Sequence, residues 1–182
     1  MKRKKEFMNI ILGNDDIMSA LKTVDSLNLP NWWLAGGCIR NIFFDLPIQD
    51  YDVIYFDSSD LNSKIDHEYA KDLEKLDPSK KWNVVNQARI HLWPKSKFGV
   101  KIERSLSSED SIRGFPEKCT CIGLKMLKDK VIVFAPYGVD DLFERKIEWN
   151  PYKIDYTRFY SRILTVYGLT GFKVGETSTI LK

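Results

Sequence analysis

A glycine pair between a short apolar run and a helical pattern constrains this chain more than any other feature of its sequence. Trp32-Trp33-Leu34-Ala35 reads as a short buried strand, Gly36-Gly37 interrupts it, and residues 38–44 carry apolar side chains at helical spacing. Glycine lets a backbone approach a ligand closely, and the first N–H groups of a helix attract anions. The pair therefore predicts either a phosphate-binding turn or an ordinary tight turn.

Two aspartates follow the glycines after a short gap. Asp50 and Asp52 lie at the start of the clearest predicted strand, 51–56, so both carboxylates are expected on one face. Two carboxylates on one face repel each other unless a divalent cation lies between them, and Mg²⁺ prefers oxygen ligands. A solvated strand entry or a turn cap is the alternative interpretation of an isolated Asp-x-Asp.

The spacing between the two motifs adds information. Twelve residues, 38–49, separate Gly37 from Asp50. A short helix of that length returns the chain to a strand beside the first strand. This arrangement places the glycines and the carboxylates at one edge of the sheet.

The remaining patterns predict strands and helices that alternate only in part. The predicted helices cover 14–28 (capped by Asn14, Asp15 or Asp16), 60–76, a short segment from 107, a segment from 140 capped by Asp140 and Asp141, and 156–167. The predicted strands cover 82–93, 98–102, 119–126 and 130–134. Because the middle strands follow one another directly, we expect an α/β (α+β) fold with a mixed β-sheet and helices packed on it.

Composition fits a single domain. The 182 residues are 43% hydrophobic and 13% aromatic, enough for one buried core. We expect a basic N-terminal segment at 1–13, one domain over 14–167 and a loose tail over 168–182. The formal charge is +3, and the basic run at the start can supply all of it, so net charge predicts no nucleic-acid partner.

The sequence also predicts a cellular context. No apolar stretch approaches the roughly 18 residues of a membrane span, and the start of the chain lacks the pattern of a signal peptide. Three cysteines give no disulfide framework. We therefore expect a cytoplasmic protein with reduced thiols and no membrane partner.

The glycine and aspartate motifs together resemble the DNA polymerase β-like nucleotidyltransferases. The head domain of CCA-adding enzymes and bacterial poly(A) polymerases is similar in detail, with Gly-Gly-x-Val-Arg-Asp where this chain has Gly36-Gly37-Cys38-Ile39-Arg40-Asn41. An uncharacterised bacterial family of nucleotidyltransferase-like proteins resembles the chain over roughly residues 15 to 160. Its matching stretches are 52–57, 86–91, 108–110 with 115–117, and 135–143. The resemblance implies the nucleotidyltransferase fold, although a fold alone does not fix an activity.

The same resemblance implies a reaction. Gly36 and Gly37 would bind the phosphates of an NTP, and Asp50 and Asp52 would be the catalytic residues that bind Mg²⁺ or Mn²⁺. The metal would activate an acceptor hydroxyl, on an RNA, a protein or a small molecule, for attack on the α-phosphorus. Arg40 would contact phosphate or brace the Asp-x-Asp strand, and a surface salt bridge is the alternative.

A third carboxylate, which the superfamily normally carries on a neighbouring strand, has no evident counterpart. The predicted strand 82–93 has no Asp or Glu, and it offers Asn86, Gln87, Arg89 and His91. Glu103 is a candidate substitute, and Asn86, Arg89 and His91 are candidate pocket residues, with a structural histidine as the alternative for His91. The missing carboxylate favours a second hypothesis, a catalytically inactive nucleotide-binding module. An RNA-associated adaptor is a third.

Other motifs favour structural roles. Cys119 and Cys121 lack the paired four-ligand spacing of a zinc site, so we expect two buried thiols on a strand. Tryptophans at 32, 33, 82 and 93 flank apolar strand positions and are expected in the core.

Overall fold

Five strands form one mixed sheet in the computed structural model of the chain. The structure describes the following residues: 2–93, 102–152, 159 and 173–174. The strand order is β3-β2-β1-β4-β5. The strands are β1 (Trp33–Ala35), β2 (Tyr51–Tyr55), β3 (Trp82–Asn86), β4 (Gly123–Leu127) and β5 (Lys130–Phe134). β2 pairs antiparallel with β1 and parallel with β3, which confirms the expected mixed α+β sheet.

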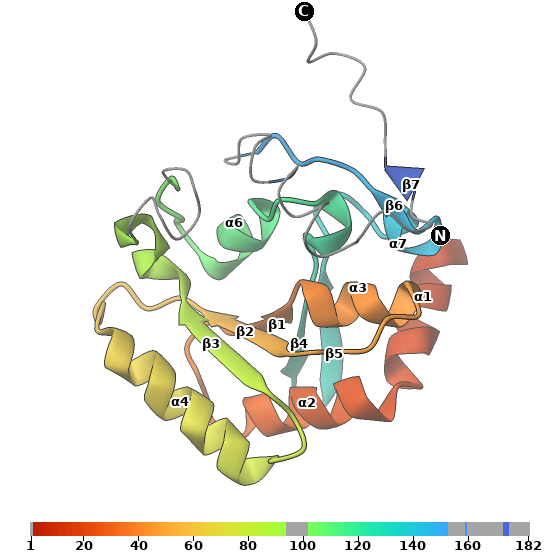
Figure 1. Ribbon diagram of the computed structural model, residues 1–182. Helices are drawn as coiled ribbons and strands as arrows, with labels where there is room; N and C mark the ends of the chain where they lie inside the picture. Colours follow the sequence, from red (N-terminus) through yellow and green to blue (C-terminus); the bar gives the residue numbers. More distant parts are fainter. Residues whose placement is uncertain (1, 94–101, 153–158, 160–172, 175–182) are drawn as a thin grey trace, which may run out of the picture.

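Helices cover both faces of this sheet. They are α1 (Lys2–Leu12), α2 (Asp15–Asp25), α3 (Gly37–Phe43), α4 (Ser63–Leu76), α6 (Ser108–Arg113) and α7 (Asp140–Phe143), with 3₁₀ turns η1 (Gln87–Leu92) and η2 (Lys118–Thr120). Figure 1 shows α2 and α4 on one side of the sheet and α6 on the other. Among the described residues, no helix is both long and apolar enough to cross a bilayer.

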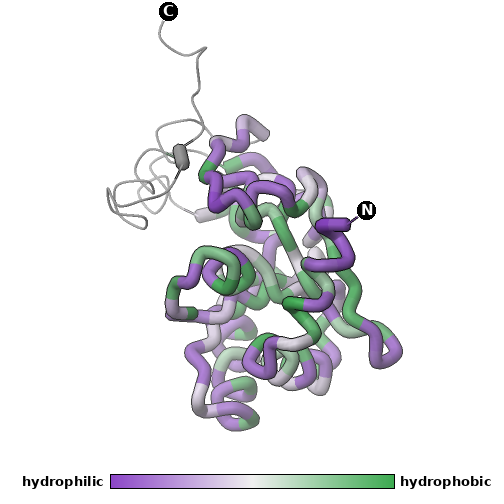
Figure 2. Tube along the Cα trace, turned by 90° about the vertical axis from the view of Figure 1, so that its right-hand side faces the viewer, coloured by the Kyte–Doolittle hydropathy of each residue, from purple (hydrophilic) through white to green (hydrophobic). Residues whose placement is uncertain are grey.

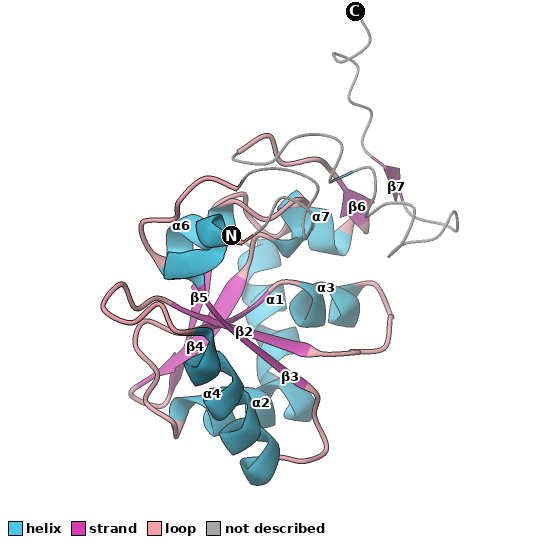
Figure 3. Ribbon diagram, turned by 60° about the vertical axis from the view of Figure 1, so that its left-hand side comes forward, coloured by secondary structure: helices cyan, strands magenta, loops and turns pink. Residues whose placement is uncertain are grey.

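The side chains on the two faces of the sheet belong to two different hydrophobic clusters. Val53 belongs to the large core cluster, which includes buried side chains of α1, α2 and α3. Ile54 belongs to a small second cluster with Trp33, Ala35 and Ile112 of α6. Because successive side chains of a strand point to opposite faces, Asp52 shares the face of Ile54. Figure 3 shows α6 on the opposite side of the sheet from α2 and α4.

The N-terminal segment is part of the core. The basic N-terminal segment expected over 1–13 contains α1, which buries Phe7 and Ile11. Phe7 stacks on Phe43 of α3, with ring centroids 5.3 Å apart. Figure 2 shows that the first turn of α1 is hydrophilic. The basic residues that dominate the sequence of this segment therefore lie at the surface of an amphipathic helix.

Part of the expected tail is also ordered. Lys173–Val174 forms β7, which pairs in parallel with β6 (Lys146–Ile147). The expectation of a loose tail over 168–182 is therefore wrong for these two residues. The expected helix 156–167 lies outside the described residues except for Phe159, which is buried.

The predicted strand 82–93 is correct for Trp82–Asn86, which forms β3, and wrong beyond it. β3 ends at Asn86, whose side chain accepts a hydrogen bond from the backbone N–H of Ala88 and so caps η1. Alternating apolar residues in 87–92 imitate a strand, but the cap turns the chain. The expected strand 98–102 lies outside the described residues except for Ile102, which is not in a strand.

Of the two predicted helix caps, the one on α2 is correct and the one on α7 is wrong. Asn14 caps α2 by accepting a hydrogen bond of 2.9 Å from the backbone N–H of Ile17, as expected. Asp140 and Asp141 do not cap α7, because Val139 occupies the cap position and they lie in the first turn. The hairpin strand β4 begins at Gly123, later than the predicted residue 119, because η2 precedes it.

Candidate active site

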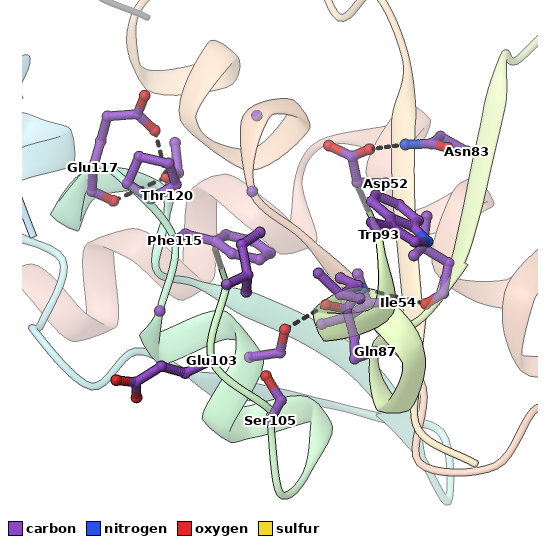
Figure 4. A pocket seen from close by; sticks show the side chains of 18 residues that line it. Asp52, Ile54, Asn83, Gln87, Trp93, Glu103, Ser105, Phe115, Glu117 and Thr120 are labelled. Atoms are coloured by element: carbon purple, nitrogen blue, oxygen red, sulfur yellow. Dashed lines mark hydrogen bonds between the residues drawn. The ribbon is translucent and has the colours of Figure 1, made fainter. Parts of the chain in front are cut away.

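A cavity of about 210 Å³ lies on the α6 face of the sheet. Gly36, Gly37 and Asp52 line it, together with Asn83 of β3 and Ser111 of α6. The short connection between Gly37 and β2 therefore brings both sequence motifs to one site. Figure 4 shows the labelled side chains that surround the cavity.

Gly36 is required by geometry. Its φ of +77° lies in the left-handed region, which side chains other than glycine rarely adopt. A Cβ at this position would lie 3.3 Å from the ring of Phe115 and 3.8 Å from Oδ2 of Asp52. The missing side chain therefore leaves space directly beside the carboxylate.

Asp52 is held from the neighbouring strand. Asn83 is its register partner on β3, and the Nδ2 group of Asn83 donates a 2.7 Å hydrogen bond to Oδ1 of Asp52. Oδ2 of Asp52 lies on the side of Gly36. Asn83 thus orients one oxygen of the carboxylate and directs the other toward the glycine turn.

Asp50 occupies a less central position. It precedes β2 by one residue, it is half-buried, and it is not among the residues that line the cavity. The described residues include no group of three or more His, Cys, Asp or Glu side chains that could hold a metal ion. Mg²⁺ is often held by one or two carboxylates together with substrate phosphates. The donor set around Asp52 fits a cation of that kind, completed by a ligand.

Arg40 lies behind the glycine turn. It is 4% exposed, which excludes the surface salt bridge considered from the sequence. Its Nε and Nη2 groups donate hydrogen bonds of 2.9 Å and 2.6 Å to Oδ1 of Asn41. Asn41 in turn donates a 2.8 Å hydrogen bond to the carbonyl of Pro47, in the loop that leads to β2. These contacts link Arg40 through Asn41 to the loop before β2.

Two glutamates line the cavity away from Asp52. Glu103 is exposed, and Figure 4 shows it across the cavity from Asp52 with its carboxylate pointing away. Glu117 is fully buried and accepts a 2.9 Å hydrogen bond from the hydroxyl of Thr120. Glu117 belongs to the stretch 115–117 that resembles the bacterial family, but the irregular loop around it has no periodicity that predicts a site role.

Asn86, Arg89 and His91 do not line the cavity. Asn86 braces the loop after β2 by donating hydrogen bonds to the carbonyls of Asp57 and Asp60, each 2.8 Å long. Arg89 forms an ion pair with a buried carboxylate of α4. In the described part of the chain, the buried Nδ1 of His91 has no hydrogen-bond partner. Asn86 is the last residue of β3, and strand alternation directs its side chain to the face opposite Asn83. Arg89 and His91 lie in η1, which replaces the expected end of the strand.

The cysteines are buried free thiols. We expected both Cys119 and Cys121 on a strand. Cys119 instead lies in η2, and Cys121 follows η2 before β4 begins. Burial raises the pKa of Cys38 and Cys119, and it raises the pKa of Cys121 to about 12. Thiols with such pKa values remain protonated at neutral pH and react slowly.

We expect this protection to be visible in a labelling experiment. The folded protein should react slowly with Ellman's reagent from about pH 7 to about pH 9, whereas ordinary cysteines with a pKa of about 8.5 become thiolates in this range. Guanidinium-unfolded protein, as the control, should release colour for all three thiols. Fast reaction of the folded protein at pH 8 would contradict the burial of the cysteines.

Solved structures share this fold. An NMR structure described as revealing a CCA-adding enzyme head domain has a TM-score of 0.77 and 24% identity, covering 97% of this chain and 98% of that one. A CCA-adding enzyme solved with CTP has a TM-score of 0.58 and 14% identity, covering 96% of this chain. The Thermotoga maritima CCA-adding enzyme solved with tRNA has a TM-score of 0.59 and 13% identity, covering 93%. The chain spans 43% and 42% of these two longer enzymes. The fold is that of a nucleotidyltransferase head domain.

A protein-family model also matches the chain and identifies its family. The model described as nucleotidyltransferase matches residues 22–167, most of the chain. No curated protein matches the chain significantly. The chain therefore belongs to this nucleotidyltransferase family, as the resemblance of its motifs indicated.

Proposed function

We propose that the protein transfers a nucleoside monophosphate from an NTP to an acceptor hydroxyl with the help of Mg²⁺ or Mn²⁺. The observation that carries the proposal is the shared cavity of Gly36, Gly37 and Asp52, in which the glycine turn leaves space beside Oδ2 of Asp52. A carboxylate beside an open backbone turn is suited to a phosphate-bound cation. Family membership supports nucleotidyl transfer as the reaction class.

Each residue of the site would have a different role in the reaction. Gly36 and Gly37 would let the triphosphate approach the backbone, and Asp52 with Asp50 would hold the cation. The bound cation would neutralise phosphate charge and activate the acceptor hydroxyl. Arg40 would keep the loop before β2 in place through Asn41. Asn83 would keep the carboxylate of Asp52 oriented.

A nucleotide-binding module without turnover is the second candidate. The position on β3 that faces Asp52 holds an amide, Asn83, and not a carboxylate. Glu103 lies across the cavity and points away from Asp52. An incomplete set of anionic ligands weakens metal binding, which favours a protein that binds an NTP without transferring it.

A transfer assay tests both candidates. Each α-³²P-labelled NTP is incubated with Mg²⁺ or Mn²⁺ and with the protein itself, cell protein, small hydroxyl compounds or RNA. The RNA set includes tRNA, because a similar enzyme was solved with it. Label transfer that is lost in the Asp50→Ala, Asp52→Ala double variant supports the enzyme. Metal-dependent NTP binding without transfer supports the module, and absence of both contradicts both.

The Asn83→Asp variant gives a further prediction. An aspartate at this position faces Asp52 across the strand pair, so we expect Mn²⁺ to bind about 10- to 100-fold more tightly in the presence of a non-hydrolysable NTP. Without metal, the two carboxylates should repel each other and lower the melting temperature. Calorimetric titration and thermal melting measure the two effects. Asn83→Ala is the control and should weaken Mn²⁺ binding, and equal affinity in all three proteins would show that Asn83 does not act on the metal site.

A further inference from the structure

Three polar side chains line the end of the cavity away from Asp52. They are Gln87, Ser105 and Ser111, and their residues are 2%, 6% and 8% exposed. Figure 4 shows Gln87 and Ser105 at this end, with the hydroxyl of Ser105 directed into the cavity. We call these three side chains the polar trio. The metal-binding role proposed for Asp52 does not use them.

Gln87 is fixed in orientation. Its Oε1 accepts a hydrogen bond from the hydroxyl of Ser111, and its Nε2 donates a 3.3 Å hydrogen bond to the carbonyl of Val85. A glutamine amide has two N–H donors and two acceptor lone pairs. One donor and one lone pair of Gln87 therefore remain for a ligand in the cavity.

Ser105 adds an unused group. Its hydroxyl lines the cavity, and no residue in the described ranges forms a hydrogen bond with it. Because the hydroxyl opens into the cavity, it is available to hydrogen-bond with a ligand that enters there. The polar trio thus offers several hydrogen-bonding groups that converge on one small volume.

The surroundings of the polar trio are apolar. Ile54, Val85, Ile90 and Phe115 line the same cavity. An apolar chamber with a few fixed polar groups is typical of a specific small-molecule site. A nucleobase matches this chemistry, because its faces are apolar and its edge carries adjacent hydrogen-bond donors and acceptors.

We propose that the polar trio reads the edge of the nucleobase while the triphosphate lies at Gly36 and Asp52. This inference rests on the proposed function and deepens it, because it assigns base selection to residues of the head domain itself. The cavity connects the two ends, so one nucleotide can reach both groups of residues. Gln87 is the central selecting residue, since both ends of its amide are fixed.

Binding measurements with four NTPs and a base-free probe test the proposal. Affinities of ATP, GTP, CTP, UTP and inorganic tripolyphosphate are measured with Mg²⁺ for the full chain and for Gln87→Leu. We expect the preferred NTP to bind about 5- to 150-fold more weakly to the variant, with tripolyphosphate unchanged. Ser105→Ala leaves no protein group unpaired and should reduce the same preference by a smaller factor, whereas the exposed Ser58→Ala serves as its matched control.

The Gln87→Glu variant gives a directional result. A carboxylate only accepts hydrogen bonds, and guanine is the base whose edge offers two adjacent donors. We expect the preference of this variant to shift toward GTP, which a purely structural role of Gln87 would not produce. Thermal melting verifies that each variant is folded.

The possible outcomes distinguish a failure of base recognition from a failure of nucleotide binding. If NTPs bind but Gln87→Leu and Ser105→Ala change no preference, the base is read elsewhere and the inference is overturned. If NTPs bind no more tightly than tripolyphosphate, the base is not recognised and the inference is also overturned. If neither NTPs nor tripolyphosphate bind, the proposed function fails and takes the inference with it.

Discussion

Asp52→Asn is expected to abolish nucleotidyl transfer and leave the fold intact. Asparagine has nearly the same size, and its side-chain oxygen can still accept the hydrogen bond from Asn83. The variant removes the negative charge that would hold the cation beside Gly36. Metal stabilisation of a phosphoryl transition state is worth several kcal/mol, so the transfer rate should fall at least about 1,000-fold.

The assay needs a matched control. Asp129→Asn makes the same chemical change in the exposed β4–β5 turn, where φ is +59° and asparagine is well tolerated. Its transfer rate should equal that of the unmodified protein, and EDTA should stop both until Mg²⁺ is added. Transfer by Asp52→Asn at more than a tenth of the normal rate would exclude Asp52 as the metal-binding residue. If the Asp52→Asn protein transferred label at the full normal rate and EDTA still stopped the transfer, a contaminating metal-dependent enzyme would be the source.

The position of Asp52 was predictable because it depends on local sequence. The strand, the glycine turn, the short helix and the next strand follow one another within residues 33–55, and short connections restrict how such elements pack. The family model and the solved structures confirm the fold that this pattern indicated. Asn83, the partner of Asp52, depends on the register of β2 and β3, which residue spacing alone does not fix.

The opposite end of the cavity was not predictable. Ser105, Ser111 and Glu117 come from α6 and irregular loops, and they meet β2 only through long-range packing. Glu117 lies in one of the stretches that resemble the bacterial family, but no periodicity assigns a site role to it or to the two serines. The tertiary structure, and not local pattern, assembles this half of the site.

Arg89 shows how a charged residue near a site can serve the fold. It forms an ion pair with Asp66 of α4, a residue that is 4% exposed. The carboxylate of Asp66 also accepts a 2.7 Å hydrogen bond from the hydroxyl of Tyr55 and a 3.3 Å hydrogen bond from the backbone N–H of Asn86. Burial and the hydrogen bond to Asp66 raise the pKa of Tyr55. Asp66 thus joins α4, β2, the end of β3 and η1.

Asp66→Ala is therefore expected to lower the free energy of unfolding by about 3–5 kcal/mol, because the charge of Arg89 would remain buried without its partner. Urea unfolding followed by tryptophan fluorescence measures the loss. The control is Asp72→Ala in the same helix, whose ion pair with Lys75 has side chains 48% and 74% exposed. Such an exposed pair contributes at most about 1 kcal/mol.

A double variant separates charge burial from packing. Combining Asp66→Leu with Arg89→Met removes both charges and retains apolar volume, so it should recover the part of the lost stability that comes from the unpaired charge of Arg89. The hydroxyl of Tyr55 and the backbone N–H of Asn86 still lose their acceptor in this variant, so recovery should be incomplete. Full recovery of NTP binding in this variant would show that Arg89 acts on the fold and not on the nucleotide. If NTP binding stayed weak although stability returned, Arg89 would belong to the binding site after all.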